Sequence, residues 1–274
     1  MEGDISKIDN ILFNLGYLDL LAYRDSEIHR VNPVAKFITT VVYLFFVISF
    51  NRYEIKMLLP FSIYPLFLIL RADLPFGYIL KKVLYVSPFV IMVGIFNPIF
   101  DRHIFFSFNG INITSGWVSF LSIIIKYFLT VTTVIVLIGV TGFYNLCYAM
   151  NKVGVPKVFS VQLLFLYRYI FLITEEAARM TRARELRTPI SKPVSLKVYG
   201  SLAGHLLLRS INRAERIHRS MILRGFNGNI KIAGRTSYRL NDFIFMSLWI
   251  LVFIFFRFFD ISDFIGKLVL KVFL

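Results

Sequence analysis

Two arginines are the residues best placed to do chemistry in this chain, and that chemistry is recognition. Arg184 and Arg224 each lie near the expected carboxyl end of a long helix, where a side chain can reach into a groove on another protein. A guanidinium group there can pair with a carboxylate. Truncating one partner of such a pair at a buried interface typically costs about 2 to 5 kcal/mol. Two such helix ends could hold two copies of one partner.

The sequence offers no set of residues for catalysis, nucleotide binding or metal binding by this chain alone. Its histidines are scattered, without paired cysteines or an H-E-x-x-H motif, at His29, His103, His205 and His218. It has no G-x-x-x-x-G-K-[ST] loop to cradle ATP and no G-x-S-x-G elbow. We therefore expect a non-catalytic chain without cofactor or metal of its own, so that any energy for its function would come from a partner.

The elements that carry these arginines belong to a membrane protein. Of 274 residues, 57% are hydrophobic and 17% aromatic, an apolar share above that of soluble domains. Five stretches are candidates to cross a bilayer: Ala35–Phe50, Ile55–Leu70, Val83–Phe100, a region between Trp117 and Met150, and Asp242–Phe259. The sequence predicts an all-α, polytopic membrane helical bundle with about five spans and a cytoplasmic coupling segment of long amphipathic helices.

Lys126 sets the start of the fourth span. A lysine at mid-membrane costs on the order of 3 kcal/mol, so we expect it near the outer surface, extending towards the interface. The span then runs from about Tyr127 towards Leu146, with Trp117–Ile125 along the interface. A substrate role for Lys126 is the less favoured interpretation.

Basic residues are concentrated in one third of the chain. The net charge is +15, and residues 151–240 contain 17 Lys or Arg against 4 Glu. Short loops rich in Lys and Arg tend to stay cytoplasmic, which predicts that the amino terminus and this segment face the cytoplasm. The chain divides into residues 1–150 (amino-terminal segment and four spans), 151–240 (cytoplasmic coupling segment) and 241–274 (last span and tail).

Two long helices are expected within residues 151–240. One runs from Val158 to Arg187 and is broken at Thr188-Pro189, and the second runs from Tyr199 to Leu223 and ends near Gly225. Apolar residues at helical spacing predict its packing face: Leu207, Ile211, Ala214, Ile217 and Met221. Arginines are expected on the opposite side, at Arg209, Arg213 and Arg216. Gly200 and Gly204 form a weak G-x-x-x-G pattern, interpreted as helix packing.

Several stretches together resemble one known family. Near the amino terminus they are Leu18-Asp19, Asp25-Ser26, His29-Arg30-Val31-Asn32-Pro33 and Lys36, similar to the pattern S-x-x-H-R-x-D-P-x-x-K with Asn32 in place of Asp. Further along they are Phe171–Met180, Ala183–Glu185, Gly200–Gly204, Arg209-Ser210, Arg213-Ala214 and Met221–Gly228. With these residues the chain resembles the transmembrane T component of energy-coupling factor importers, in its cobalt/nickel-type CbiQ branch.

The resemblance implies which residues act in coupling. In this family two Ala-Arg-Gly-like motifs end the coupling helices and insert into grooves on two ATPase subunits. Here they would be Ala183-Arg184-Glu185 and Leu223-Arg224-Gly225, with Glu185 replacing a Gly and Leu223 replacing an Ala. The chain would transmit closure of the ATPases to a substrate-binding membrane subunit.

The resemblance also implies the partners and the location. These are two CbiO-like ATPase subunits, which would bind ATP and magnesium, and a CbiM-like substrate-binding S subunit, with or without a small CbiN-like accessory subunit. The location is the lipid bilayer of a prokaryotic inner or plasma membrane. No nucleic acid is expected. Cobalt or nickel as cargo follows from the branch alone, and a T component serving vitamin-type S components is an alternative. A membrane enzyme acting on lipid substrates, or a membrane-anchored nucleic-acid binder, stays open as a more distant one.

Overall fold

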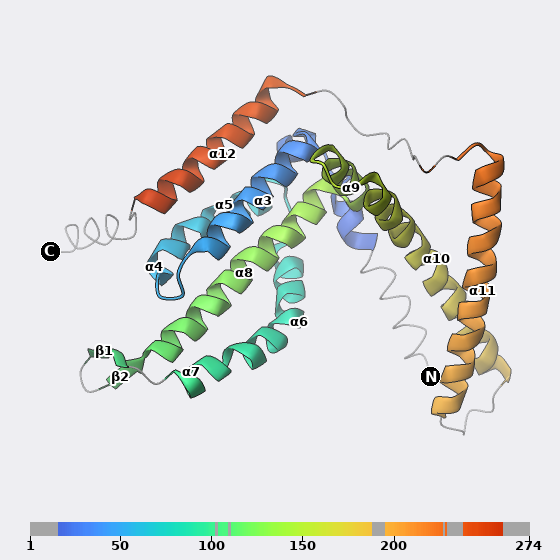
Figure 1. Ribbon diagram of the computed structural model, residues 1–274, viewed down its shortest axis with the longest axis horizontal. Coiled ribbons are helices and arrows are strands. Elements are labelled where there is room, and N and C mark those ends of the chain that lie inside the picture. Colours follow the sequence, from blue (N-terminus) through green and yellow to red (C-terminus); the bar gives the residue numbers. More distant parts are fainter. Residues whose placement is uncertain are drawn as a thin grey trace. The chain divides into compact units, whose positions relative to one another are not determined.

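The structure is a computed structural model that describes residues 16–101, 104–108, 111–187, 195–226, 228 and 238–259. The chain divides into two compact units. The larger unit comprises Leu20–Gly142 and Arg235–Leu274, and the smaller unit comprises Met1–Asp19 and Phe143–Gly234. Figure 1 labels the helices of both, and each unit is described by itself below.

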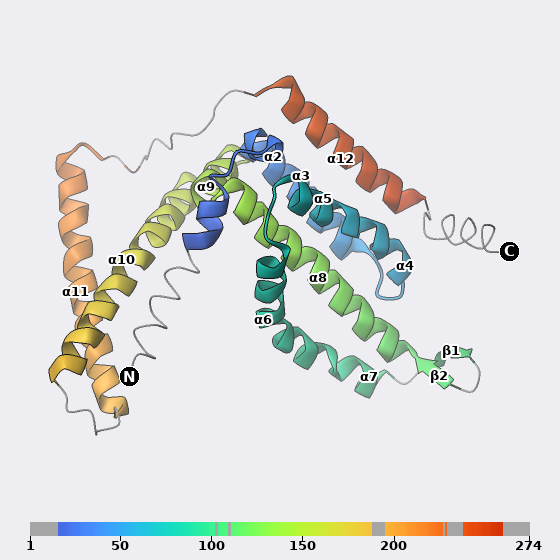
Figure 2. The ribbon, with the colours of Figure 1, turned by 180° about the vertical axis from the view of Figure 1, so that it is seen from behind.

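The larger unit contains most of the described helices. In chain order its elements are α2 (Glu27–Arg30), α3 (Pro33–Ser49), α4 (Ile55–Leu58), a 3-10 turn η1 (Leu59–Ser62), α5 (Ile63–Arg71), α6 (Phe76–Gly94), α7 (Phe96–Phe100), β1 (Ile104–Phe108), β2 (Ile111–Thr114), α8 (Ser115–Thr141) and α12 (Leu240–Phe258). The strands β1 and β2 form a short antiparallel hairpin. Helix α3 contacts both α8 and α12, and Figure 2 shows α2 just before it.

Aromatic side chains form the core of the larger unit. Tyr43 of α3, Phe61 of η1, Tyr64 of α5 and Phe253 of α12 are almost completely buried. The Tyr43 ring centroid lies 4.9 Å from that of Tyr64 and 5.4 Å from that of Phe253. Such pairs add about 0.5–1.5 kcal/mol beyond the burial of their area. The cluster therefore joins α3, α5 and α12 into one packed body.

The expected class, an all-α membrane helical bundle, is confirmed. Four helical stretches of the described residues are long and apolar enough to cross a membrane: Phe76–Phe100, Ser115–Thr141, Lys157–Arg187 and Leu240–Phe258. Helix α3 is a shorter apolar helix of 17 residues. The predicted span Ile55–Leu70 is interrupted at η1, where Pro60 lacks the N–H that a continuous helix needs.

The predicted start of the fourth span was wrong. Helix α8 runs without a break from Ser115, so Trp117–Ile125 belongs to the same helix as Lys126. The Lys126 ammonium donates a hydrogen bond to the carbonyl of Phe50, the C-cap residue of α3. Because the carboxyl end of a helix attracts a cation, this carbonyl compensates the charge of Lys126. The helix ends at Gly142, where φ of +75° favours glycine.

The described part of the smaller unit includes the helices α9 (Phe143–Lys152), α10 (Lys157–Arg187) and α11 (Leu196–Leu223). Asp19 Oδ1 accepts the backbone N–H of Phe143 at 3.0 Å, which satisfies a free donor at the start of α9. The two long helices predicted from the sequence are confirmed to within a few residues at each end. Their expected break at Thr188-Pro189 lies outside the described residues.

Candidate coupling site

Helices α10 and α11 are held together by a shared carboxylate. Glu176 of α10 accepts a hydrogen bond from Arg209 of α11 at 2.6 Å and another from Arg179 of its own helix at 2.9 Å. The Glu176 side chain is only 18% exposed, whereas the two arginine side chains are more than half exposed. The carboxylate is therefore a fixed point between the helices, with the guanidinium groups reaching it from the surface.

The first predicted contact motif, Ala183-Arg184-Glu185, lies in the last turns of α10. Ala183 is exposed. The Arg184 side chain is only 16% exposed because its guanidinium carbon lies 5.7 Å from the centroid of the Tyr199 ring in α11. Glu185 Oε1 lies 3.9 Å from the same guanidinium group. Arg184 thus rests against its own chain, held by an aromatic face and a neighbouring acid.

The second predicted motif, Leu223-Arg224-Gly225, forms the carboxyl end of α11. Gly225 has φ of +78°, its N–H donates to Ile222 O, and the Phe226 N–H donates to Met221 O, both at 2.9 Å. This is the Schellman arrangement that ends a helix at a glycine. Leu223, Arg224 and Gly225 are all exposed, so this end is open to contact.

The two motifs lie at opposite ends of α11. Arg184 contacts Tyr199 in the first turns of that helix, and Arg224 is its C-cap. A rise of 1.5 Å per residue between Tyr199 and Arg224 gives a separation of roughly 38 Å. Because both motifs contact or belong to one continuous helix, a movement of one end is carried to the other.

The predicted packing face of α11 was partly wrong. Its half-buried residues follow a helical stripe of Leu202, Leu206, Ser210, Arg213, Ile217 and Met221. Ile217 and Met221 were predicted correctly, but Leu207 and Ile211 are 60% and 47% exposed. Arg213, expected on the opposite side, lies on the stripe. Arg213 can face α10 because that helix presents polar side chains, Glu176 and Tyr169, as well as apolar ones.

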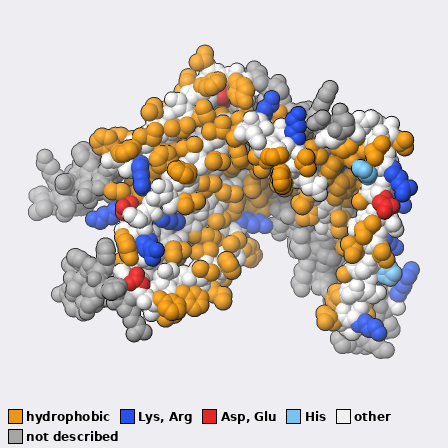
Figure 3. All heavy atoms as spheres, in the orientation of Figure 1, with side chains coloured by type: hydrophobic (Ala, Val, Ile, Leu, Met, Phe, Trp, Pro, Cys, Tyr) orange, Lys and Arg blue, Asp and Glu red, His pale blue; other side chains and the backbone are white. Residues whose placement is uncertain are grey.

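The G-x-x-x-G pattern of Gly200 and Gly204 does not mediate close packing between described helices of this chain. A Cβ atom added at Gly200 or Gly204 would meet no atom within 4 Å. Neither glycine therefore permits a close helix crossing among the described residues. Basic side chains gather along α11 instead, as Figure 3 shows.

The amino-terminal motif that contributed to the resemblance ties helices of the larger unit together. The Asn32 side chain accepts the Val34 N–H at 2.9 Å and so caps α3, with Pro33 at the first helical position. The Asn32 backbone N–H donates to Oδ1 of Asp242 in α12 at 2.8 Å. An aspartate at position 32 would bring a second carboxylate close to Asp242, and asparagine avoids that repulsion while keeping the cap.

His29 and Lys36 of this motif also make structural contacts. The Lys36 ammonium donates to Val140 O, in the last turn of α8, at 3.1 Å. His29 Nδ1 lies 2.7 Å from Ser26 Oγ, and its Nε2 lies 3.1 Å from Leu21 O. Burial, and then the positive charge of Lys36, lower the pKa of His29 below its ordinary value. The ring is therefore fixed at both nitrogens, in surroundings that disfavour its charged form.

The described residues contain no candidate metal site. No group of three or more His, Cys, Asp or Glu side chains is gathered in that part of the chain. His205 and His218 are exposed on α11, Cys147 is buried in α9, and His103 lies outside the described residues.

Sequence reasoning missed three features of these helices. In the smaller unit, one is the contact of Tyr199 in α11 with Arg184 in α10. In the larger unit, another is the buried carboxylate of Asp242 in α12, which accepts a hydrogen bond from the N-cap residue of α3. The third is an elongated groove between α10 and α11, with a cavity volume of about 900 Å³. The apolar side chains at steps of three and four from Val158 to Ile173 were a signal for a second packed face on α10.

Comparison with known proteins identifies relatives of this chain. The family model CbiQ, described as cobalt transport protein, matches residues 24–238, well over half of the chain. An uncharacterized protein of Methanocaldococcus jannaschii is 32% identical over 103 residues, which are 37% of this chain and 38% of that protein. A second uncharacterized protein of the same organism is 26% identical over 235 residues, 82% of this chain and 80% of that protein. Nickel permease LarQ of Lactiplantibacillus plantarum is 28% identical over 119 residues, 43% of each chain.

Proposed function

The chain belongs to the CbiQ family of cobalt transport proteins, and on that basis we propose that it is the coupling component of an energy-coupling factor importer. In this role it has no catalytic site of its own. It transmits the closure of two CbiO-like ATPase subunits to a CbiM-like substrate-binding membrane subunit, with or without a CbiN-like accessory subunit. Cobalt or nickel is the proposed cargo.

The observation that carries the proposal is the position of Arg184 and Arg224 at the two ends of α11. One ATPase subunit would accept the end of α10 with Arg184, and the other would accept the Schellman turn with Arg224. Two sites roughly 38 Å apart on one continuous helix suit a partner that is itself a pair of subunits. A change in the distance between those subunits would then turn or shift α11.

The two motifs differ in how accessible their arginines are to a partner. Arg224 is exposed, so a partner carboxylate can approach it directly. Arg184 is covered by Tyr199 and Glu185, so a partner acid must reach the exposed edge of the guanidinium group or displace Glu185. In the proposed assembly the two motifs therefore contribute unequally, and Arg224 is the stronger contact.

The proposed orientation places the amino terminus, α10 and α11 on the cytoplasmic side of a prokaryotic inner or plasma membrane. Its support is the concentration of 17 Lys or Arg in residues 151–240. ATPase subunits work where ATP is available, so coupling helices on that side are required by the same proposal.

Charge reversal at the two arginines tests the coupling role. The chain is produced together with its ATPase and substrate-binding subunits, and the assembly is purified through a tag on this chain. Arg224→Glu is expected to lower ATPase retention by at least 30-fold, because about 2 kcal/mol or more is lost with one member of a buried charge pair. Arg184→Glu is expected to give a smaller loss, and both variants are expected to lose metal uptake.

Arg219→Glu is the matched control for these variants. Arg219 lies in α11 less than two turns before Arg224, is 78% exposed and pairs with Glu215 of the same helix. Its reversal changes the charge of α11 equally but should leave ATPase retention intact. Normal retention and uptake by both Arg184→Glu and Arg224→Glu would reject the coupling role. Uptake assays with cobalt, nickel and vitamins separate the proposed cargo from the vitamin-type alternative.

A further inference from the structure

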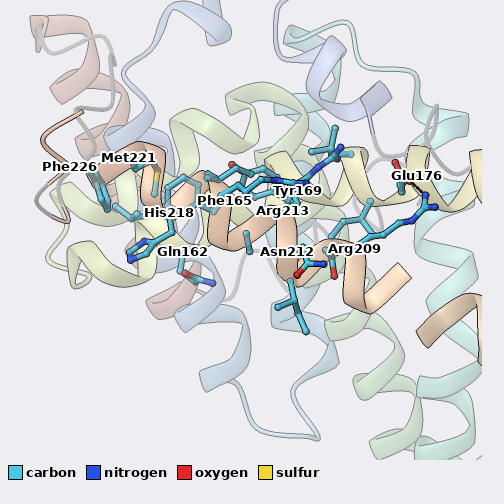
Figure 4. A pocket seen from close by; sticks show the side chains of 18 of the residues that line it. Gln162, Phe165, Tyr169, Glu176, Arg209, Asn212, Arg213, His218, Met221 and Phe226 are labelled. Atoms are coloured by element: carbon cyan, nitrogen blue, oxygen red, sulfur yellow. Dashed lines mark hydrogen bonds and ion pairs between the residues drawn. The ribbon is translucent and has the colours of Figure 1, made fainter. Parts of the chain in front are cut away.

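The groove between α10 and α11 has an apolar wall and a cationic rim. Its wall is formed by one face of α10 together with the end of α11, with Val161, Phe165, Leu172, Ile217 and Met221 among its members. Figure 4 shows Phe165 and Tyr169 from α10 and Met221 and Phe226 from the end of α11. The Schellman turn that ends α11 brings Phe226 back towards Met221, and so completes this wall.

Two arginines of the groove have no acidic counterpart in the part of the chain that the structure describes. Arg213 and Arg216 both line it, one half-buried and the other exposed. Arg209 is already bound to Glu176, the acid of the groove. Across the described residues, neither Arg213 nor Arg216 forms an ion pair with an Asp or Glu. They are three residues apart on one helix and thus neighbours on its surface, which suits two-sided binding of a phosphate.

We propose that this groove binds one anionic phospholipid, with its acyl chains against the α10 face and its phosphate on Arg213 and Arg216. A free phosphate would use the two arginines but leave the apolar wall uncovered. An uncharged apolar molecule would cover the wall but leave the two cations without a counter-charge. An amphipathic anion satisfies both requirements at once.

The apolar surface of α10 favours a phospholipid over other anions, because it suits contact with a membrane. The helix contains an 18-residue stretch apolar enough for a membrane, and only 11% of that stretch is buried by the rest of the chain. Its remaining apolar surface needs a non-aqueous neighbour. Basic residues at a membrane surface attract anionic headgroups by about 1 kcal/mol each. This inference is independent of the coupling role, because it concerns a ligand of the isolated chain.

Native mass spectrometry of the purified full chain in a neutral detergent tests the site. The probes are phosphatidylglycerol, phosphatidylcholine with the same acyl chains, and inorganic phosphate. One phosphatidylglycerol per chain is expected, at least fivefold tighter than phosphatidylcholine, with no retention of phosphate. Arg216→Gln should weaken phosphatidylglycerol about fivefold, and Arg213→Gln with Arg216→Gln roughly 30-fold, equivalent to about 2 kcal/mol.

Two further variants separate the groove from the general charge of the helix. Arg219→Gln removes an exposed cation of α11 that does not line the groove and should leave lipid retention unchanged. Phe165→Ala should weaken both lipids, because it shortens the apolar wall without touching the arginines. An equal loss from Arg219→Gln, or equal binding of the two lipids, would overturn the proposal.

A polypeptide is the competing occupant of the groove. A photo-crosslinking residue at Gln162, which lines the groove, is introduced into the chain within its purified assembly. Crosslinks to phospholipid support the proposal. Crosslinks to another subunit, with no lipid adduct, would show instead that the groove is a protein interface. Neither result bears on ATPase retention, so the coupling proposal is tested separately.

Discussion

Asp242 is a buried carboxylate at the start of two helices, and its replacement should loosen α12 from α3. The side chain is 4% exposed. Oδ1 accepts the Asn32 N–H at the start of α3, and Oδ2 accepts the Arg239 N–H at the start of α12, both at 2.8 Å. Negative charge at a helix amino terminus is favourable, so one carboxylate stabilises both helix starts.

The size of the effect follows from the two hydrogen bonds. Asp242→Asn keeps one acceptor oxygen but turns an amide N–H2 towards the second backbone N–H. One charge-assisted bond is lost, at about 1.5–3 kcal/mol. Asp242→Ala leaves both donors without the carboxylate and should cost roughly twice as much. At about 2–4 °C per kcal/mol, Tm should fall by roughly 3–12 °C in Asp242→Asn and further in Asp242→Ala.

Tryptophan fluorescence during heating of the detergent-solubilised chain measures this change, because Trp249 lies on α12 with its ring centroid 4.8 Å from that of Tyr64. Asp25→Asn is the control. Asp25 is an exposed acid paired with Arg30, and exposed pairs contribute little. Equal Tm values for wild type and Asp242→Ala, or equal shifts in Asp242→Asn and Asp25→Asn, would refute the structural role of Asp242.

Three further changes have definite outcomes. Gly225→Ala places a side chain at φ of +78°, so it should fray the end of α11 at a cost on the order of 1 kcal/mol, seen as faster amide exchange there. Tyr199→Ala removes a cation–π contact of about 0.5–1 kcal/mol and should weaken ATPase capture two- to fivefold, whereas Tyr199→Phe should not. The pKa of His29 is lowered by burial and by Lys36. At a pH between the pKa of His29 in the folded state and its higher pKa in the unfolded state, the unfolded state binds more protons. The free energy of unfolding therefore falls as pH drops below about 6.5. His29→Gln should make Tm depend less on pH in this range.

Helices α10 and α11 were largely predictable because their signals are local. Helix formers run unbroken to Arg187, and Gly225 follows the last periodic residue of α11. The ends of α10 and α11 accordingly agree with expectation to within a few residues. The candidate residues Ala183–Glu185 and Leu223–Gly225 were therefore placed at helix ends by the sequence alone.

The errors came from contacts between residues far apart in the sequence. Nothing near Lys126 in the sequence reveals that the carbonyl of Phe50, 76 positions away, will accept a hydrogen bond from its ammonium group. The face of α11 was assigned to its most apolar stripe, but the stripe that packs includes Arg213. The bond of Asn32 to Asp242 spans 210 positions and has no signature in hydropathy.

Helix α10 has an apolar first part and a charged second part. Hydropathy alone therefore does not decide whether the helix belongs to the membrane or to the aqueous side. Its first part, up to Thr174, is apolar enough for a membrane, whereas the part from Glu175 onward carries the charged residues. Arg184 lies nine residues beyond Glu175, roughly 14 Å further along the helix axis. Because Met221 and Phe226, on either side of Arg224, line one groove with Val161 and Phe165 of the apolar part, Arg224 lies alongside that part. Arg184 and Arg224 both stay accessible when the apolar part rests on the membrane surface. The Glu176–Arg209 pair joins α11 to α10 just beyond the apolar part, so in the proposed coupling role a force on Arg224 is carried to α10 through this carboxylate.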